Sequence, residues 1–357
     1  MRRPDPLPSI DEVRAQLGEH GITQVGVTTA DVLADARVAL LERRAAGLHG
    51  EMAFTYRDPE RSTDPQRAVP GARSVIVAAK SYLTDDDPPR PEPARGAHAR
   101  VGRYAWVDHY EPLRSALREV CRRIRRSDHR AVAFADDNSI VDRAVAHRAG
   151  LGWYGKNANL LLPGAGSWFV LGSIVTTAPY DPAPAPAPDG CGSCVRCIDA
   201  CPTGAIVSPG VIDANRCISW ILQKPGAIPV EFRTAIGDRI YGCDDCQDAC
   251  PVSVRLGRRN TVDLDERAAA WVDAVELLAA DDTRIEELYG HWYVTDRNFR
   301  WVRRNALVVL GNVGDPRDVR VRRALEHYRA DIDPILAEHA NSAVGRLAAR
   351  SQAVAGP

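Results

Sequence analysis

The chain has 357 residues, of which 45% are hydrophobic and 26% charged, and its formal net charge at pH 7 is −1. This composition is that of an ordinary globular protein with roughly two or three domains. The near-zero charge excludes a global attraction to nucleic acid or membrane, so a polyanion would need a local basic patch. No apolar run approaches the ~20 residues of a membrane span, and the N-terminus, MRRPDPLPSIDEV, lacks the apolar core of a secretory signal.

Helices and strands alternate in the first half of the chain. Ser9 and Glu12 form a capping-box pattern at the start of a helix that ends near Gly18. Ser139 is the predicted N-cap of a later helix, with Asp142 three residues on. The other predicted elements are strand 22–28, helix 31–46, strand 74–79, helix 110–126, strand 131–135, helix 139–149 and strands 159–162 and 168–176. Their alternation predicts an α/β domain over residues 1–180.

Asp136 falls between a predicted strand and the helix that follows it. In α/β domains this edge of the sheet is where ligands usually bind. A lone aspartate in such a place is more often a turn residue than a catalyst, so the residues by themselves leave its role open.

A glycine-dense segment follows at residues 150–172. Its first part, GLGWYG, matches the dinucleotide fingerprint, but it follows a predicted helix and leads into a strand, which is the wrong context for an NAD site. Glycines allow close approach to a ligand, although they also form tight turns between strands, and both interpretations stay open. The candidate ligand contacts here are Lys156, Asn157 and Trp168.

The cysteines of residues 191–250 carry the strongest chemical signal. The run Cys191-x2-Cys194-x2-Cys197-x3-Cys201-Pro has the spacing of bacterial ferredoxins, in which the fourth cysteine ligates the other 4Fe–4S cluster. The second run lacks its first cysteine, which Cys217 can supply. We therefore predict one cluster on Cys191, Cys194, Cys197 and Cys250, and another on Cys201, Cys217, Cys243 and Cys246. Structural zinc is the alternative, but zinc ligands usually come as two separated pairs. Cys121 is left over and is expected to pack as a small hydrophobe.

The proline-rich segment DPAPAPAP at residues 181–188 predicts a boundary. We expect a two-cluster ferredoxin-like domain at 181–260 and an all-helical domain at 261–357. In the latter, residues 305–311 are echoed by residues 339–345, a period typical of paired-helix repeats. Arg297, Arg300 and Arg304 share one helix face, which is either a solvated surface or an RNA-binding edge.

Together these stretches resemble the epoxyqueuosine reductase family. The resemblance rests on GEM at residues 50–52, PGARSVI at 70–76, RYA at 103–105, AGLGW at 149–153, GK at 155–156, CPTGAI at 201–206, RCIS at 216–219 and RIYGCDDC at 239–246. The last of these is more specific than the ferredoxin spacing, and the resemblance covers nearly the whole chain.

The resemblance implies a cobalamin-binding α/β domain, two 4Fe–4S clusters, a HEAT-like repeat and a tRNA substrate. Asp136 takes the place of the family's catalytic aspartate, as the acid that protonates the departing epoxide oxygen. Arg57, Tyr104, Lys156 and Ser219 fall in motifs that line the cobalamin pocket. The implied partners are a tRNA anticodon stem-loop and an electron donor such as a ferredoxin or flavodoxin, with the enzyme a cytoplasmic monomer.

The sequence departs from the family pattern around the substrate pocket. The positions are Asn138 and Ser139 after Asp136, Lys224 where the family has an acidic residue, and Val252 after the last cysteine. In the same stretch Gln223 stands where the family commonly has isoleucine. Two other functions are therefore kept: a related cobalamin and iron–sulfur reductase with a different, small substrate, and a plain electron-transfer protein. The second of these predicts a much smaller chain.

Overall fold

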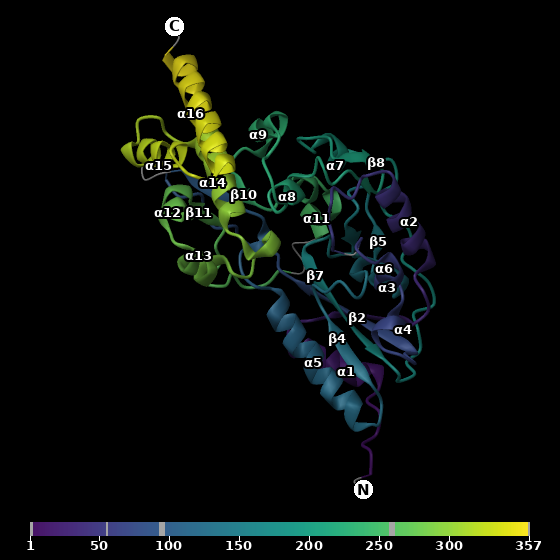
Figure 1. Ribbon diagram of the computed structural model, residues 1–357. Coiled ribbons are helices and arrows are strands. Elements are labelled where there is room, and N and C mark those ends of the chain that lie inside the picture. The colour runs from purple at the N-terminus through teal and green to yellow at the C-terminus, as the bar shows by residue number, and fades with distance from the viewer. Residues whose placement is uncertain (1–2, 55, 93–96, 257–260, 356–357) are drawn as a thin grey trace.

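The computed structural model describes residues 3–54, 56–92, 97–256 and 261–355. Figure 1 shows a tapering region of helices and strands that ends at the N-terminus, and a helical lobe that ends with α16 at the C-terminus. The cysteine-rich segment, which carries α7 to α11, lies between these two regions in the same view. The mixed helix-and-strand character expected from the sequence is confirmed.

A four-stranded sheet organises the N-terminal region. Its order is β1 (Gln24–Thr29), β2 (Ser74–Ser81), β7 (Phe169–Thr176) and β4 (Ala131–Phe134). All three strand pairs are antiparallel, with Val77 opposite both Gly26 and Ser173. The alternation of helices and strands in the sequence does not distinguish this sheet from a parallel one. Because neighbouring strands are antiparallel, their carboxyl ends do not meet at one edge of the sheet. The ends of β2 and β4 nevertheless lie at the edge where β1 and β7 begin, and Asp136 follows β4 there.

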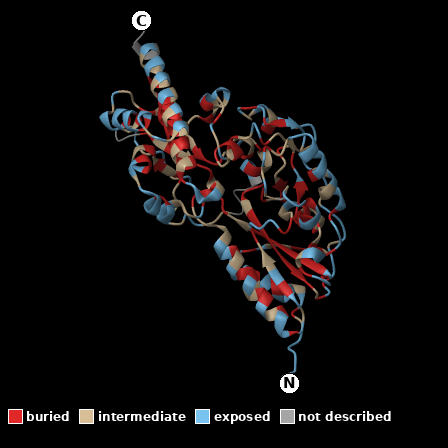
Figure 2. Cartoon of the chain, in the orientation of Figure 1, coloured by how far each residue is buried: buried red, intermediate tan, exposed pale blue. Residues whose placement is uncertain are grey.

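Helices cover both faces of this sheet. Ile76 and Ala78 of β2 pack with α1 (Ile10–Gly18) and α5 (Tyr110–Arg126) on one face. Val75 and Val77 pack on the other with α6 (Asp142–Arg148) and the segment that leads into α2 (Ala34–Ala45). Burial on both sides explains why β2 is continuously apolar from Val75 to Ala79 rather than alternating, and Figure 2 shows the strands as a buried layer. Short helices α3 (Pro59–Ser62) and α4 (Pro65–Ala68) border this layer.

Two local predictions are settled here. The capping box of Ser9 and Glu12 is confirmed, because both reciprocal hydrogen bonds are present. The prediction for Ser139 is wrong, since α6 begins only at Asp142 and has Val141 as its N-cap. The backbone N–H of Val141 donates to the carbonyl of Ser62, and that of Ser139 donates to Asp137 Oδ1, so residues 137–141 are held as a loop. Cys121 is buried in α5, as expected, and burial raises its pKa to about 12.

The cysteine-rich segment folds into short elements. They are α7 (Arg196–Asp199), β8 (Ile206–Ser208), β9 (Val211–Ile212), α8 (Ile218–Ile221), α9 (Val230–Ile236), β10 (Arg239–Tyr241), α10 (Asp245–Asp248) and α11 (Pro251–Leu256). The glycine-dense segment forms a hairpin of β5 (Trp153–Tyr154) and β6 (Leu160–Leu161) beside them. A Cβ on Gly152 would lie 2.2 Å from the Leu161 carbonyl oxygen, and one on Gly166 would lie 2.6 Å from Ser253 Cα. At these two positions glycine therefore serves a tight hairpin and close packing against α11.

A second sheet joins the three predicted domains. β3 (His98–Val101) lies between β10, to which it is parallel, and β11 (Trp271–Asp273), to which it is antiparallel. Each strand comes from a different one of the ranges 1–180, 181–260 and 261–357. The three ranges therefore share backbone hydrogen bonds and one hydrophobic core. The expectation of helix alone beyond residue 260 is wrong at β11.

The C-terminal lobe contains α12 (Ala274–Ala279), α13 (Asp282–Tyr289), α14 (Arg300–Val313), α15 (Val319–Arg329) and α16 (Pro334–Ala355). The echoed stretches lie on α14 and α16, which pack against each other. At their contact a Cβ on Gly311 would come within 2.8 Å of Ala343 Cα, whereas one on Gly345 would meet nothing within 4 Å. The two copies of the repeat therefore have different packing roles.

Candidate functional site

Four thiols line one small cavity. Cys191, Cys194, Cys197 and Cys250 surround about 120 Å³ of space, together with Leu161, Pro251 and Val252. Cys191 and Cys194 come from the loop before α7, Cys197 lies in α7, and Cys250 directly precedes α11. The fold thus brings the last cysteine of the second run to the first three of the first run.

The other four thiols form a second group, and all four are partly exposed. Cys217 is the N-cap of α8, Cys243 follows β10 and Cys246 lies in α10. Besides burial, the charge of Cys217 raises the pKa of both Cys243 and Cys246, so the three thiols lie close together. Cys201 acts on Cys217 and accepts a hydrogen bond from the Ala205 N–H at 3.2 Å. Burial raises the pKa of Cys217, Cys246 and Cys243, the last to about 12, so a bound cation would be needed to hold them as thiolates.

The spacing of these thiols bears on the zinc alternative. Tetrahedral zinc needs four sulfurs at about 2.3 Å from a single ion. Across the described ranges, no three His, Cys, Asp or Glu side chains lie close enough to hold one metal ion. A 4Fe–4S cube binds each cysteine to a different iron, so it holds its four sulfurs farther apart than a single zinc ion does.

Two predicted ligand contacts lie against the cysteine loops. Lys156 Nζ donates to the carbonyl of Gly192 at 2.7 Å, and Asn157 Nδ2 donates to the carbonyl of Cys246 at 3.3 Å. Both residues also line the cavity of the first thiol group. Asn157 therefore connects that cavity to the second group of thiols.

Asp136 lies in the loop after β4, with its backbone in the left-handed region at φ 54°. Its side chain reaches solvent, yet the surrounding protein removes enough water to raise its pKa. Arg114 opposes this rise, while Asp108 and Asp137 add to it. The pKa of the neighbouring Asp142 is raised well above its usual range, mainly by burial and secondly by the charge of Asp136.

Three tyrosines share this space with Asp136. The charge of Asp136 acts on both Tyr110, at the start of α5, and Tyr241, in β10. Tyr104 lies in the short helix η2 (Arg103–Ala105), with its ring centroid 6.0 Å from that of Tyr241. Burial raises the pKa of all three hydroxyls, so they are neutral hydrogen-bonding groups near pH 7. The ring of Tyr104 lies so close to Gly242 that a Cβ there would come within 2.9 Å.

The second thiol group adjoins the same tyrosines, because Cys217 acts electrostatically on Tyr104. Ser219 lies two residues after Cys217, and Gln223 Nε2 donates to Tyr104 Oη at 3.0 Å. We did not predict Tyr110, Tyr241 or Gln223 as site residues. The i,i+4 spacing of Ser219 and Gln223 was a usable signal for Gln223.

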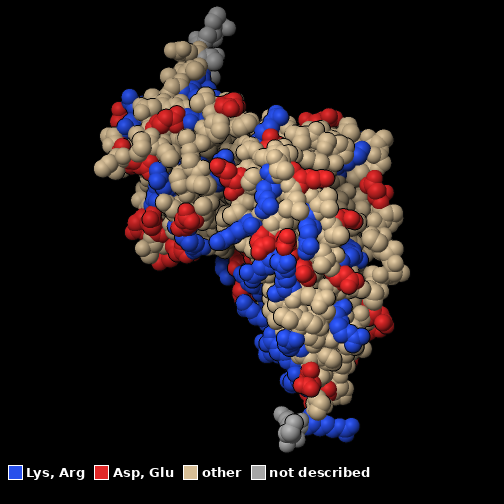
Figure 3. Space-filling view, turned by 45° about the vertical axis from the view of Figure 1, so that its right-hand side comes forward, with Lys and Arg blue, Asp and Glu red and all other residues tan. Residues whose placement is uncertain are grey.

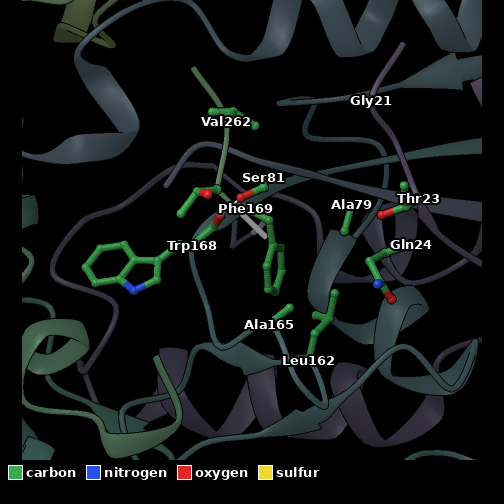
Figure 4. A pocket seen from close by; sticks show the side chains of 11 residues that line it. Gly21, Thr23, Gln24, Ala79, Ser81, Leu162, Ala165, Trp168, Phe169 and Val262 are labelled. Atoms are coloured by element: carbon green, nitrogen blue, oxygen red, sulfur yellow. Dashed lines mark hydrogen bonds between the residues drawn. The ribbon is translucent and has the colours of Figure 1, made fainter. Parts of the chain in front are cut away.

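Trp168 borders a different cavity at the same edge of the sheet. This cavity has a volume of about 240 Å³. Figure 4 shows Trp168, Phe169 and Leu162 along it, and Thr23 and Gln24 at the start of β1 on its other side. None of its lining side chains titrates near neutral pH, so it can bind a neutral group but not transfer protons. The guanidinium of Arg103 lies 4.8 Å from the Trp168 ring centroid. Arg57 lies on the loop before α3, and its side chain is exposed.

The arginine row of the C-terminal lobe is not a row on the surface. Arg304 is fully buried and donates to the carbonyls of Ile221, Leu222, Lys224 and Gly226. Desolvation and the charges of Arg233 and Arg300 lower its pKa to about 9. Arg300 pairs with Asp333 at 2.7 Å, and Arg297 pairs with Glu286. Both earlier interpretations are therefore wrong for Arg304, because helical periodicity does not reveal what covers a face.

No helix in the described part of the chain is both long and apolar enough to cross a membrane.

Comparisons with known proteins agree with this geometry. Residues 190–253 match the 4Fe–4S double cluster binding domain family, and residues 62–137 match the family described as epoxyqueuosine reductase QueG, DUF1730. The chain is 35% identical to an epoxyqueuosine reductase of Xanthomonas campestris, over 97% of this chain and 98% of that protein. It is 33% identical to one of Bacillus subtilis, over 92% of this chain and 84% of that protein.

Solved structures show the same likeness. A crystal structure of epoxyqueuosine reductase with an epoxyqueuosine-modified tRNA-Tyr stem loop matches with a TM-score of 0.85 at 31% identity, over 95% of this chain and 90% of that one. The structure of the Streptococcus thermophilus enzyme also matches with a TM-score of 0.85, at 28% identity and with the same coverage of both chains.

Proposed function

The chain belongs to the epoxyqueuosine reductase family of oxidoreductases, and on that premise we propose that it reduces epoxyqueuosine to queuosine at the wobble position of a tRNA anticodon loop. The observation that carries this proposal is that Asp136, the tyrosines and the second thiol group surround one site. A solved relative with a modified tRNA stem loop supports the substrate. Balanced, the reaction consumes the epoxide, two electrons and two protons, and yields an alkene and water.

We assign the two thiol groups to two 4Fe–4S clusters. Cys191, Cys194, Cys197 and Cys250 would hold the first, and Cys201, Cys217, Cys243 and Cys246 the second. The cavity shared by the first four and the electrostatic interactions among the second four support this division. Because the second group adjoins Tyr104, we infer that electrons leave the protein's clusters there.

Cobalamin is the cofactor that we propose for the space between this group and Asp136. When bound, it supplies a cobalt centre that accepts single electrons and delivers them to the substrate. The residues present fit a corrin, whose rim carries neutral amides, because the hydroxyls of Tyr104 and Ser219 face this space without adding charge. Trp168 and Arg57 remain proposed contacts at its margins. Lys156 and Asn157 are better explained as supports of the cysteine loops.

Asp136 would protonate the departing epoxide oxygen. A carboxyl group acts as an acid near neutral pH only if its pKa is raised, and desolvation has that effect here. Its place on an exposed loop would let it meet a base that has left the anticodon stack. A structure of the Bacillus subtilis enzyme is described with the loop of its catalytic aspartate swung out of the active site, which supports this role for such a loop.

The tRNA stem would lie along the basic face of α5. Figure 3 shows Lys and Arg side chains gathered on the tapering part of the molecule that leads to the N-terminus, where α5 runs. This helix carries six arginines and two glutamates, and Arg118, Arg122 and Arg126 have exposed side chains. The helix starts beside the site, since the charge of Arg114 lowers the pKa of Asp136.

We further propose a cytoplasmic monomer with a ferredoxin or flavodoxin as electron donor, and HEAT-like stacking in the C-terminal lobe.

The deciding experiment is a single-turnover assay. Anaerobically purified protein, reconstituted with iron, sulfide and cobalamin and chemically reduced, is mixed with epoxyqueuosine-containing tRNA. Conversion to queuosine is the expected result. No conversion by protein that retains its clusters and corrin would overturn the proposal and favour a related reductase with another substrate. The substitutions Asn138, Ser139, Lys224 and Val252 would then mark that substrate's pocket.

A further inference from the structure

The segment after α8 is held by its backbone from the C-terminal lobe. Three successive carbonyls take part: that of Leu222 accepts from Asn305 Nδ2 at 2.7 Å, that of Gln223 from Thr295 Oγ1 at 3.1 Å, and that of Lys224 from Arg304 at 2.9 Å. Asn305 Nδ2 also donates to the carbonyl of Ile240 in β10, at 3.0 Å. These donors therefore fix the segment relative to α8 and β10, the two elements next to Cys217 and Cys243.

The side chain of Gln223 reaches into the site. Its Nε2 donates to Tyr104 Oη at 3.0 Å and lies 3.5 Å from Ser219 Oγ. Residue 223 is thus anchored through its backbone on one side and presents its amide on the other. Such anchoring reduces the entropy that the side chain loses when it forms these bonds.

The hydrogen bond from Gln223 sets the direction of the Tyr104 hydroxyl. Tyr104 Oη accepts this bond and also takes part in hydrogen bonds with Ser219 and Tyr241, so the amide of Gln223 gives the hydroxyl a further fixed partner. The ring has little freedom to move, because the backbone at Gly102 and Gly242 lies close beside it. An isoleucine at position 223, the residue common in the family, would provide no such donor.

We propose that Gln223 is a cofactor-binding residue, whose amide aligns the hydroxyls of Tyr104 and Ser219 toward neutral carboxamide groups on the rim of the corrin. This inference rests on the proposed function, because it takes cobalamin as the ligand of this space. The chemistry agrees, since carboxamides both donate and accept hydrogen bonds, and so do the two hydroxyls and the amide.

The test is binding of cobalamin to the cluster-loaded protein, followed by absorbance and without turnover. Gln223→Met keeps the side-chain length but removes the donor, and Tyr104→Phe removes its acceptor. Each is expected to weaken binding roughly five- to tenfold, the effect of one lost hydrogen bond. The double variant is expected to be little weaker than either single variant, because both changes remove the same bond. Gln66→Met, at an exposed glutamine remote from the site, is the control.

The outcomes separate the two proposals. If the wild type binds cobalamin while Gln223→Met binds equally well, or if the two losses simply add, the role of Gln223 is overturned and the proposed function stands. If the wild type carries its clusters but binds no cobalamin, the proposed function fails and the role of Gln223 fails with it. Iron content measured on every variant shows that the fold has survived each substitution.

Discussion

At the scale of the residue, the backbone of Asp136 is as informative as its side chain. A non-glycine residue at φ 54° is disfavoured and persists only where its surroundings impose it. Here the next residue, Asp137, accepts the N–H of Ser139, which tightens the loop directly after β4. The carboxyl group therefore lies within electrostatic range of Tyr110, Tyr241 and Arg114 while it still reaches solvent.

Asp136→Asn is expected to retain iron and cobalamin and to lose roughly 100-fold or more of the single-turnover rate, because the amide cannot donate a proton as an acid. In the wild type only the protonated acid acts, so the rate falls as pH rises through the pKa of Asp136. Since desolvation raises that pKa, the fall comes at a higher pH than for an ordinary aspartate. A rate profile with the same pH dependence in the variant would contradict this role.

At the scale of the element, α14 and α16 show how two similar stretches can differ in packing. Gly311 faces the partner helix so closely that any side chain must displace Ala343, while Gly345 has open space around it. Glycine within a helix is less favourable than alanine by about 1 kcal/mol, so it is retained at 311 for contact and not for helix formation.

This contrast gives a matched pair of variants. Gly311→Ala is expected to lower the midpoint of thermal unfolding, because the new methyl group forces the helices apart. Gly345→Ala is expected to leave it unchanged or raise it slightly, through helix propensity alone. Equal effects of the two substitutions, measured by circular dichroism, would show that the contact between α14 and α16 is not as described.

The arginines of α5 can be tested as an element. Among the described residues, Arg118 and Arg122 form ion pairs with Glu111 and Glu119 of the same helix, and such exposed pairs contribute little stability. Charge reversal at both, Arg118→Glu with Arg122→Glu, is therefore expected to weaken tRNA binding and reduce its salt dependence while leaving the fold intact. Reversal at Arg322 and Arg323 of α15 is the control. Affinity that changes equally in both double variants would point to net charge rather than to this face.

At the scale of the whole molecule, the C-terminal lobe supports the cysteine-rich segment. In addition to the contacts of Arg304 and Asn305, Asn312 of α14 donates to the carbonyls of Arg233 and Gly237. Glu338 of α16 forms a bidentate ion pair with Arg233, with both N–O distances at 2.8 Å. Removing the lobe to test its role in tRNA binding would therefore also disturb the segment that carries the second thiol group.

A single side chain tests this dependence. Arg304→Met removes the side-chain donor to the carbonyls of Ile221, Lys224 and Gly226 and one of two donors to that of Leu222, and it is expected to destabilise the protein by roughly 2–4 kcal/mol. It is also expected to reduce iron content, because Cys217 is the N-cap of α8, whose last turn Arg304 holds. Arg300→Met, one turn earlier on the same helix, removes a partly exposed ion pair and is expected to do neither. Both are measured by urea denaturation and iron analysis, and full iron in Arg304→Met would contradict the dependence.

The sequence by itself determined what is local in this protein. The capping box at Ser9, the bounds of α5, the burial of Cys121 and the apolar β2 follow from short-range patterns, and all are confirmed. Family membership followed from the motifs, above all RIYGCDDC, because each demands particular residues at fixed spacing.

Only the tertiary structure decided which distant groups meet. Residue patterns indicate that a strand is buried but not which direction its neighbours run, so the antiparallel sheet could not be predicted. They show that Arg304 shares a helix face with Arg300 but not that backbone carbonyls of another segment cover it. The meeting of Gln223 with Tyr104 joins residues 119 positions apart. Such contacts depend on how whole elements pack, a constraint that no short stretch of the chain contains.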